Sequence, residues 1–233
     1  MATRPIFLPN KSGDLLVQTK FVEFSWSPGM AVVRKQKSIR SLHEAAIKQN
    51  ICSSPLEVSS KSSEELGVSL SAFNLKSRTR KKGNVFSVET AFQSSKVFEH
   101  GGPFRDLMYA TSRQAKKDPR IRESGRLLAF DFFGEEWKLE PKTAFYDWLY
   151  INALAKNESL AEELVHYDAF TDIEFNPKKS INCQAYSVAL FRALTMRKLI
   201  HDALANKEAY LSIIEGRPVS NAAEDTDVQG RLL

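Results

Sequence analysis

The chain has 233 residues, of which 42% are hydrophobic, 26% are charged and 10% are aromatic, and its formal net charge is +5. This composition is that of an ordinary globular protein and excludes a largely disordered chain. No basic segment followed by a sustained apolar stretch stands at the start, and no apolar run approaches membrane-spanning length. We therefore expect a cytoplasmic protein with no membrane partner.

The first third of the chain is predicted to contain a small antiparallel sheet. Its extended segments are expected at 14–19, 20–26 and 30–33, with a turn at Ser27-Pro28-Gly29. Apolar side chains then recur at helical spacing over residues 38–48, which predicts a short helix. Residues 53–65 are rich in serine and indicate a loop or an irregular strand. Residues 68–75 alternate between apolar and polar, which is a strand pattern.

From about residue 85 the pattern becomes mainly helical. Helices are expected at 87–99, 112–117, 143–156, 159–166 and 183–201. Ser159 and Glu162 have the spacing of a capping box. Residues 126–133 are predicted to be a strand or a buried loop, and residues 171–175 a short strand or a connector. The chain then ends in a predicted partly ordered tail.

Cysteine and histidine are sparse in this chain. Cys52 and Cys183 are too few for a disulfide framework and lack the close spacing of a zinc site, so both are expected to be reduced and packed. His43, His100 and His166 are scattered without the spacing of metal ligands. We therefore assign no metal and no cofactor.

Basic residues are concentrated in one short segment, at Lys76, Arg78, Arg80, Lys81 and Lys82. Smaller groups stand at Arg34, Lys35 and Lys37 and at Lys178 and Lys179. Each cluster is either a solvated loop or a contact with nucleic acid or phosphate. We take Arg78, Arg80, Lys81 and Lys82 as the candidate nucleic-acid contacts.

A carboxylate, an amide and an amine recur along the predicted helix 87–99. Residues advance by about 100° each on an ideal helix, so the directions of Glu89 and Lys96 differ by roughly 20°. Gln93 lies close to the same face. A carboxylate can activate water, and a lysine with a lowered pKa can attack a sugar carbon as a Schiff-base nucleophile. Both roles suit cleavage of an N-glycosidic bond, although Glu and Lys on one helix face are also a common solvated pair.

The NADAR family has a helix signature in which an acidic residue is followed by Phe-Gln and Lys. This chain resembles it at Val88-Glu89-Thr90-Ala91-Phe92-Gln93-Ser94-Ser95-Lys96. Further segments are similar to family landmarks in the expected order: Ser71-Ala72-Phe73-Asn74, Ser112-Arg113-Gln114-Ala115-Lys116 and Gly125-Arg126. The resemblance covers residues 68–200. It departs from the family at 180–184, where many members have Trp-Gly and then Asn with Leu-Gly, and residues 1–67 have no counterpart.

The resemblance implies an α+β fold that is mostly α-helical, and the extended segments of the first third add a small antiparallel β region at its N-terminus. Together they divide the chain into three parts. Residues 1–67 would be a β-rich extension packed on the main domain, residues 68–203 the NADAR-like catalytic domain, and residues 204–233 the partly ordered tail.

The same resemblance implies the candidate site. Glu89 and Lys96 would be catalytic, and Gln93 beside them would bind substrate. Ribose or phosphate would be held by Asn74, Ser112 and Arg126, and the pocket would include Asp172 and Asn182. An arginine suits a pyrophosphate because its fork can donate two charge-assisted hydrogen bonds. By residue type, four aromatic side chains can either stack on a base or pack in the core: Phe104, Trp137, Tyr146 and Trp148. Trp137 is the one included in the candidate site.

The function implied is that of an N-glycosidase that hydrolyses ADP-ribose from guanine bases of DNA or RNA, in the manner of an antitoxin. Its partners would be the ADP-ribosylated nucleic acid and a toxin that is a DNA ADP-ribosyltransferase. An N-glycosidase of small ribosylated metabolites, such as riboflavin-pathway intermediates, is an alternative. A non-catalytic module that binds ADP-ribose is another.

Overall fold

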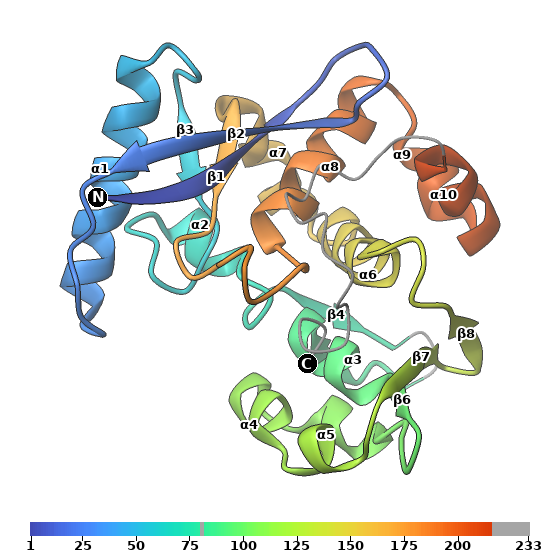
Figure 1. The fold of residues 1–233 in the computed structure, drawn as a ribbon. Coiled ribbons are helices and arrows are strands. Elements are labelled where there is room, and N and C mark those ends of the chain that lie inside the picture. Colours follow the sequence, from blue (N-terminus) through green and yellow to red (C-terminus); the bar gives the residue numbers. More distant parts are fainter. Residues whose placement is uncertain (80–81, 216–233) are drawn as a thin grey trace.

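A computed structural model describes residues 1–79 and 82–215 of the chain, and it has the expected α+β fold. Its largest sheet has the strand order β2-β1-β9-β3 (Figure 1). The strands are β1 (Ala2–Pro9), β2 (Val17–Phe24), β9 (Ala169–Thr171) and β3 (Pro55–Glu57). β1 pairs antiparallel with β2 and with β9, whereas β3 and β9 are parallel. Segments far apart in the sequence thus share one sheet.

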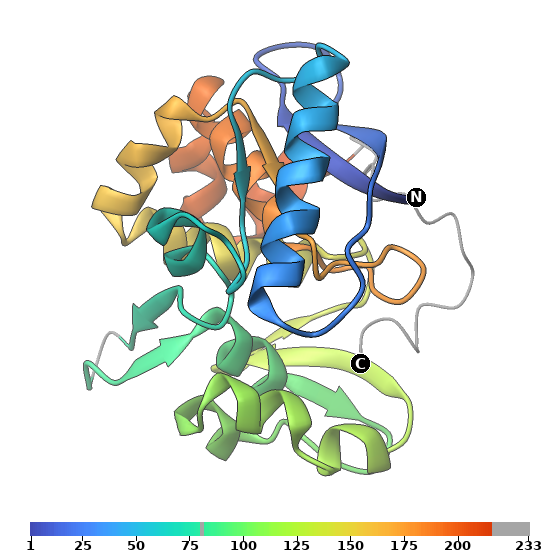
Figure 2. The same cartoon turned by 90° about the vertical axis from the view of Figure 1, so that its left-hand side faces the viewer.

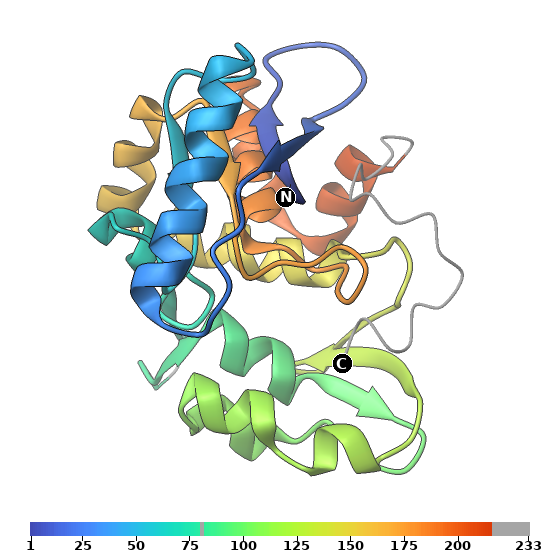
Figure 3. The ribbon, with the colours of Figure 1, turned by 60° about the vertical axis from the view of Figure 1, so that its left-hand side comes forward.

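Helices cover both faces of this sheet. Successive side chains of a strand point to opposite faces, so Ile6 of β1 packs with Leu42 of α1 (Val32–Lys48). Its neighbour Phe7 packs against Tyr186 of α8 (Gln184–Met196), with ring centroids 5.6 Å apart. Figure 2 shows α1 lying across the sheet, and in Figure 3 α8 lies behind the sheet on the other side. The sheet is therefore the middle of three layers.

Below this sheet in the view of Figure 1 lie α3 (Val88–Ser94), α4 (Ser112–Lys117) and α5 (Arg120–Glu123) together with two smaller sheets, whereas α9 (Ile200–Ala205) and α10 (Lys207–Ile214) lie to its right. A three-stranded antiparallel sheet joins β6 (Lys96–Phe98), β7 (Leu127–Phe132) and β8 (Glu135–Trp137), and β4 (Lys76–Arg78) forms a hairpin with β5 (Val85–Ser87). The other α-helices are α2 (Glu65–Ser69), α6 (Ala144–Ala155) and α7 (Glu158–Glu163). Two short 3-10 helices stand at Arg105–Tyr109 and Leu164–His166.

The N-terminal elements differ from the prediction. β1 was missed, since Pro5 and Pro9 lie within it and proline is a poor strand residue. Segments 14–19 and 20–26 are wrong as two strands, because one strand, β2, runs through them. Residues 30–33 are also wrong as an extended segment, because α1 begins at Val32. Residues 68–75 are the end of α2 followed by turns, so local alternation was overridden there by tertiary packing.

Several later elements follow the prediction. The helix at 112–117 is confirmed with the same bounds, the helix at 143–156 is α6, and 126–133 contains the strand β7. The helix predicted at 183–201 ends at Met196, because Lys198 has a φ of 60° and α9 begins after it. Ser159 and Glu162 form no capping box, since Asn157 is the N-cap of α7.

The predicted tail contains an ordered helix, α10, whose Tyr210 is fully buried. Residues 216–233 lie outside the described residues. Cys52 and Cys183 are free and buried, as expected. Across the described part of the chain, no helix is both long and apolar enough to cross a membrane. The boundaries at residues 67 and 203 remain predictions.

Candidate active site

A cavity of about 450 Å³ is lined both by residues that follow strands of the four-stranded sheet and by residues of α3, α4 and α6. Its walls come from residues 59–61 after β3, 71–73 after α2, three positions of α3, one each of α4 and α6, and several positions between 172 and 184. Pockets for small ligands have volumes of about 300–1,000 Å³, so this cavity is large enough for a nucleotide-sized group. It is the natural place to look for the predicted site.

Helix α3 places Glu89 in the wall of this cavity. Its N-cap is Ser87, whose side chain accepts from the backbone N–H of Thr90 while the Thr90 side chain accepts from the backbone of Ser87. The Glu89 N–H donates to the carbonyl of Ala72 at 2.9 Å, which ties the helix to the adjacent wall. Glu89 is only 5% exposed, and its Oε1 accepts from Gln93 Nε2 at 2.9 Å. The carboxylate and amide are thus fixed side by side.

The structure does not place Lys96 on the same helix as Glu89. α3 ends at Ser94, and Lys96 begins β6, where it pairs with Phe130 of β7. The predicted helix at 87–99 is therefore too long, because sheet pairing takes over at its end. Lys96 is fully buried, and its Nζ lies 4.8 Å from the ring centroid of Phe92. Among the described residues that line the cavity, Phe92 is present and Lys96 is not.

Burial lowers the pKa of Lys96 to about 7, because the charged ammonium loses its hydration. Glu89 opposes this shift by favouring the charged form, and the positive charge of Lys116 adds to it. A lysine in this environment is a neutral amine in a large fraction of molecules at neutral pH. Such an amine can act as a nucleophile or a base.

Lys116 is a second lysine at the site, and it was not singled out from the sequence. It lines the cavity from α4, and its Nζ lies 4.0 Å from Glu89 Oε1 and 5.3 Å from the ring centroid of Phe73. Its side chain is 55% exposed. The local sequence does not indicate that Lys116, and not Lys117, would line the cavity. Which of the two lysines faces Glu89 depends on how α4 packs on α3.

Asp172 also lines the cavity, directly after β9. It is buried, and this burial raises the pKa of its carboxyl group. Behind it, Glu57 accepts hydrogen bonds from Ser59 Oγ at 2.6 Å, Thr171 Oγ1 at 2.7 Å and the Ile173 N–H at 2.9 Å. The pKa of Glu57 is also raised, first by burial and then by Asp172. Two buried carboxyl groups therefore stand together, which favours a protonated form between them.

Three residues of the cavity wall carry a buried polar atom with no hydrogen-bond partner among the described residues. These atoms are Ser71 Oγ, Gln93 Oε1 and Asn182 Oδ1. Buried polar atoms are normally paired, and unpaired ones need an explanation. A polar ligand in the cavity would supply the missing partners.

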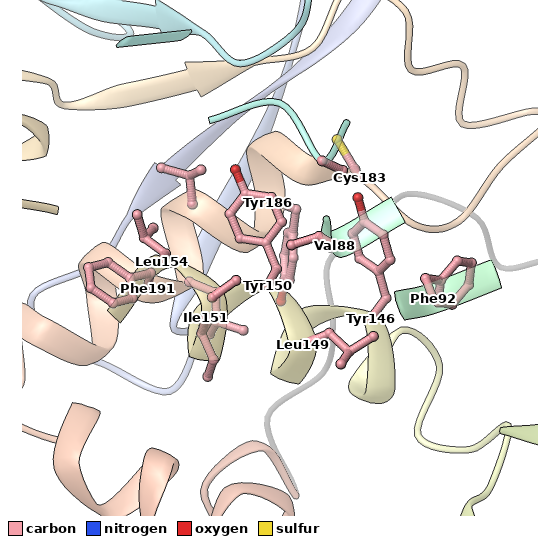
Figure 4. Packing of buried hydrophobic residues seen from close by; sticks show 14 of the residues in the cluster. Val88, Phe92, Tyr146, Leu149, Tyr150, Ile151, Leu154, Cys183, Tyr186 and Phe191 are labelled. Atoms are coloured by element: carbon pink, nitrogen blue, oxygen red, sulfur yellow. The ribbon is translucent and has the colours of Figure 1, made fainter. Parts of the chain in front are cut away.

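Aromatic rings complete the wall. Phe92 of α3 and Tyr146 of α6 lie side by side in Figure 4, with ring centroids 5.2 Å apart in an edge-to-face arrangement. Both line the cavity. Trp137 is instead buried in the core, where its ring centroid lies 5.0 Å from Trp148 and 5.5 Å from Phe145. Of the four aromatic candidates, only Tyr146 belongs to the described lining of the cavity.

Four of the predicted residues gather at the cavity, namely Glu89, Gln93, Asp172 and Asn182. Asn74 is exposed and donates to the Val68 carbonyl at 2.9 Å. Ser112 donates to the Phe73 carbonyl at 2.9 Å and lies 2.8 Å from Ser87 Oγ, so it holds α4 in place. Arg126 is exposed and pairs with Glu99 at 3.1 Å.

Two of the four predicted nucleic-acid contacts, Arg78 and Lys82, are among the described residues. Arg78 and Lys82 are exposed on the β4–β5 hairpin, and neither lines the cavity in the described part of the chain. Arg80 and Lys81 lie outside the described residues.

Comparison with known proteins identifies a family model that matches almost the whole chain. The sequence model of the DarT1-associated NADAR antitoxin family matches residues 2–224 of the chain. The match includes residues 1–67 almost completely, so the expectation that this part has no family counterpart was wrong. No curated protein matches the chain significantly.

Proposed function

Since this chain belongs to the family of DarT1-associated NADAR antitoxins, we propose that it is a cytoplasmic N-glycosidase that removes ADP-ribose from guanine bases of nucleic acid. In this role it reverses the modification made by a toxin that is a DNA ADP-ribosyltransferase. The observation that carries the proposal is the buried Glu89 in the cavity wall, which pairs with Lys116 at 4.0 Å and acts electrostatically on the fully buried Lys96 behind that wall.

Glu89 is the residue proposed to direct the chemistry. Gln93 and Lys116 hold its Oε1, at 2.9 and 4.0 Å respectively, so the carboxylate has a defined orientation. A fixed carboxylate can accept a proton from an attacking water or from a ribose hydroxyl. Hydrolysis then adds water across the bond between the ribosyl carbon and the guanine nitrogen. Its products are free ADP-ribose and a strand whose guanine is unmodified.

Lys96 is the proposed nucleophile of a covalent version of the same reaction. Its neutral amine attacks the ribosyl C1, the bond to the guanine nitrogen breaks, and the departing nitrogen takes a proton. Ring opening gives a Schiff base between Lys96 and C1, and water hydrolyses it to ADP-ribose and the free amine. Lys96 is fully buried and lies next to Phe92 of the cavity wall, so this step requires the amine to become accessible from the cavity.

Lys116 is the competing nucleophile, because it already lines the cavity. Borohydride reduces a Schiff base to a stable amine, so trapping identifies the lysine. We expect Lys96→Ala to lose the adduct with an ADP-ribosylated guanine oligonucleotide, and Lys116→Ala to keep it with a raised KM. An adduct that is lost only in Lys116→Ala would assign the nucleophile to Lys116. If the enzyme is active but no adduct is trapped, direct attack by water guided by Glu89 is the remaining mechanism.

A binding module without turnover is the second candidate, because Lys96 is fully buried and outside the described cavity lining. It predicts that ADP-ribose binding, measured by calorimetry, survives Glu89→Gln and Lys96→Ala, and that wild-type protein releases nothing from the oligonucleotide.

A further inference from the structure

We propose that the nucleic-acid strand next to the modified base runs over a basic surface beside the cavity, formed by Arg4, Trp26, Arg34, Lys35, Lys178 and Lys179. We call it the α1 surface. The inference rests on the proposed function in one respect, since it assumes that the modified base belongs to a nucleic acid. It replaces the expectation that the β4–β5 hairpin carries this strand.

Trp26 is the centre of the α1 surface. The ring is partly exposed, and it lies between the strands and the start of α1. Arg4 Cζ lies 5.4 Å and Lys35 Nζ 5.0 Å from the ring centroid. Both cations lie over the ring, so Trp26 holds two positive charges close together by cation-π contacts. Clustered cations of this kind pair with the phosphates of a nucleic-acid strand.

The α1 surface is continuous with the cavity. Lys35 Nζ pairs with Glu174 Oε1 at 3.0 Å, and Glu174 lines the cavity. Burial lowers the pKa of Arg4, whereas the carboxylates of Asp172 and Glu174 raise it. Arg4 therefore lies close to these two residues of the cavity wall. Lys179 lines the cavity as well. A strand that enters the cavity with one base therefore meets these cations at the next phosphates.

The loop 172–183 brings further positive charge to this surface. It lies beside the connection between β2 and α1 in both Figure 2 and Figure 3. Lys178 and Lys179 on the loop are exposed, as is Arg34 on α1. The cations of the α1 surface thus outnumber the carboxylates of Asp172 and Glu174 at the cavity mouth, and burial raises the pKa of Asp172, which favours its neutral form. This charge is complementary to a phosphodiester backbone.

The β4–β5 hairpin is the natural comparison. It carries Arg78 and Lys82, both exposed, but in Figure 2 it lies on the opposite side of the molecule from the loop 172–183. The two surfaces therefore make separable predictions.

The test compares two variants with the same change in charge. The first is Arg34→Glu with Lys178→Glu, and the control is Arg78→Glu with Lys82→Glu; all four residues are exposed and outside the described cavity lining. Binding of an unmodified, fluorescein-labelled single-stranded DNA is measured by fluorescence anisotropy over a series of salt concentrations. For the α1-surface variant we expect Kd to rise about tenfold and the slope of log K against log salt to shrink by about 1.4, as for two lost phosphate contacts. The hairpin variant should match the wild type.

An equal loss in both variants, or a loss in the hairpin variant alone, would overturn the inference. The inference would also be overturned if the α1-surface variant bound DNA as tightly as the wild type does but no longer bound the toxin. That result would indicate that the surface binds a protein partner. Because this assay uses unmodified DNA and no turnover, it separates the two proposals. An inactive protein that still binds DNA through the α1 surface would contradict the glycosidase function only.

Turnover gives a second readout of the α1 surface. We expect the α1-surface variant to raise KM about tenfold for a modified oligonucleotide and to leave kcat unchanged, since its residues position the strand and not the reacting atoms. Cleavage of ADP-ribosylated guanosine, which has no flanking strand, should be unchanged. Equal losses on both substrates would contradict the proposed role of the surface.

Discussion

At the scale of single residues, the burial of Lys96 has a consequence for the pH dependence of the reaction. An amine nucleophile must be neutral, and burial lowers the pKa of Lys96 to about 7. We expect kcat/KM to rise with pH through about 7 and then level off. The profile is measured on an ADP-ribosylated oligonucleotide. Lys116→Ala should keep a rising limb but move it to higher pH, because it removes a positive charge that lowers the pKa of Lys96. A limb that rises only above pH 9 would mean that Lys96 is not the group that titrates.

Glu57 supports a second prediction at this scale. Its carboxyl group accepts three hydrogen bonds beneath the cavity wall, from Ser59, Thr171 and Ile173. Glu57→Ala leaves these donors unpaired and should lower the free energy of unfolding by about 2–4 kcal/mol. Glu57→Gln has the shape of a protonated Glu57, so it should cost much less if the raised pKa keeps the group protonated. Urea unfolding of both variants measures this, and equal losses would mean that Glu57 is ionised.

The family resemblance and helix spacing together located part of the site. Glu89 and Gln93 were found because they stand on a short helix with a recognisable family signature. Lys116 could not be found this way, because its place beside Glu89 depends on the packing of α4 against α3. Arg126 fits a phosphate by its chemistry, but Glu99 binds it at the surface instead.

At the scale of elements, the capping of α3 decides how Glu89 is presented. Ser87 and Thr90 form a capping box at its start, whereas Ser159 of α7 is not an N-cap. Ser87→Ala should lower the free energy of unfolding by about 1–2 kcal/mol, and Ser159→Ala by less than about 0.5 kcal/mol. Chemical denaturation of the two variants checks this contrast. A similar small effect in both would show that the capping box contributes little to stability.

Element boundaries were predictable only where local pattern and tertiary packing agree. α4 lies at the predicted residues because its capping residue Thr111 and its end are local features. α3 ends at Ser94 because Lys96 pairs with Phe130 in a sheet, and that strand lies far away in the sequence. β1 was also not predictable from its local pattern, because it contains two prolines. It is nevertheless a strand, and it pairs with β2 along its whole length.

At the scale of the whole molecule, buried ionisable groups make stability depend on pH. Asp147 of α6 accepts hydrogen bonds from Thr143 and Ser187, both at 2.6 Å, and its burial raises its pKa to about 7. Its contribution is full below the unfolded pKa of about 4 and is lost as pH rises through about 7. Asp147→Asn removes this titration. We measure the free energy of unfolding of both proteins in urea at pH 4 and pH 8. Between these two values the difference between Asp147→Asn and wild type should change by roughly 3 kcal/mol in favour of the variant. A difference that does not change with pH would contradict the raised pKa.

The cavity is formed by segments that are far apart in the sequence. Gln184 accepts from the Ala72 N–H at 2.8 Å, which joins two walls that are 112 residues apart in the sequence. Sequence patterns predicted the α+β class and the order of many elements. The family resemblance, and not any local pattern, placed Asp172 in one pocket with Glu89, because Asp172 follows a strand shared with the N-terminal segment.

The most direct test of the central claim is to incubate the protein with an oligonucleotide that carries ADP-ribose on guanine and to follow both products by mass spectrometry. The matched variants are Glu89→Gln, in the cavity wall, and Glu162→Gln, at an exposed position of α7. We expect wild type and Glu162→Gln to release free ADP-ribose together with the unmodified strand, and Glu89→Gln to release neither. Intact modified oligonucleotide after incubation with wild-type protein, or full release by Glu89→Gln, would contradict the account.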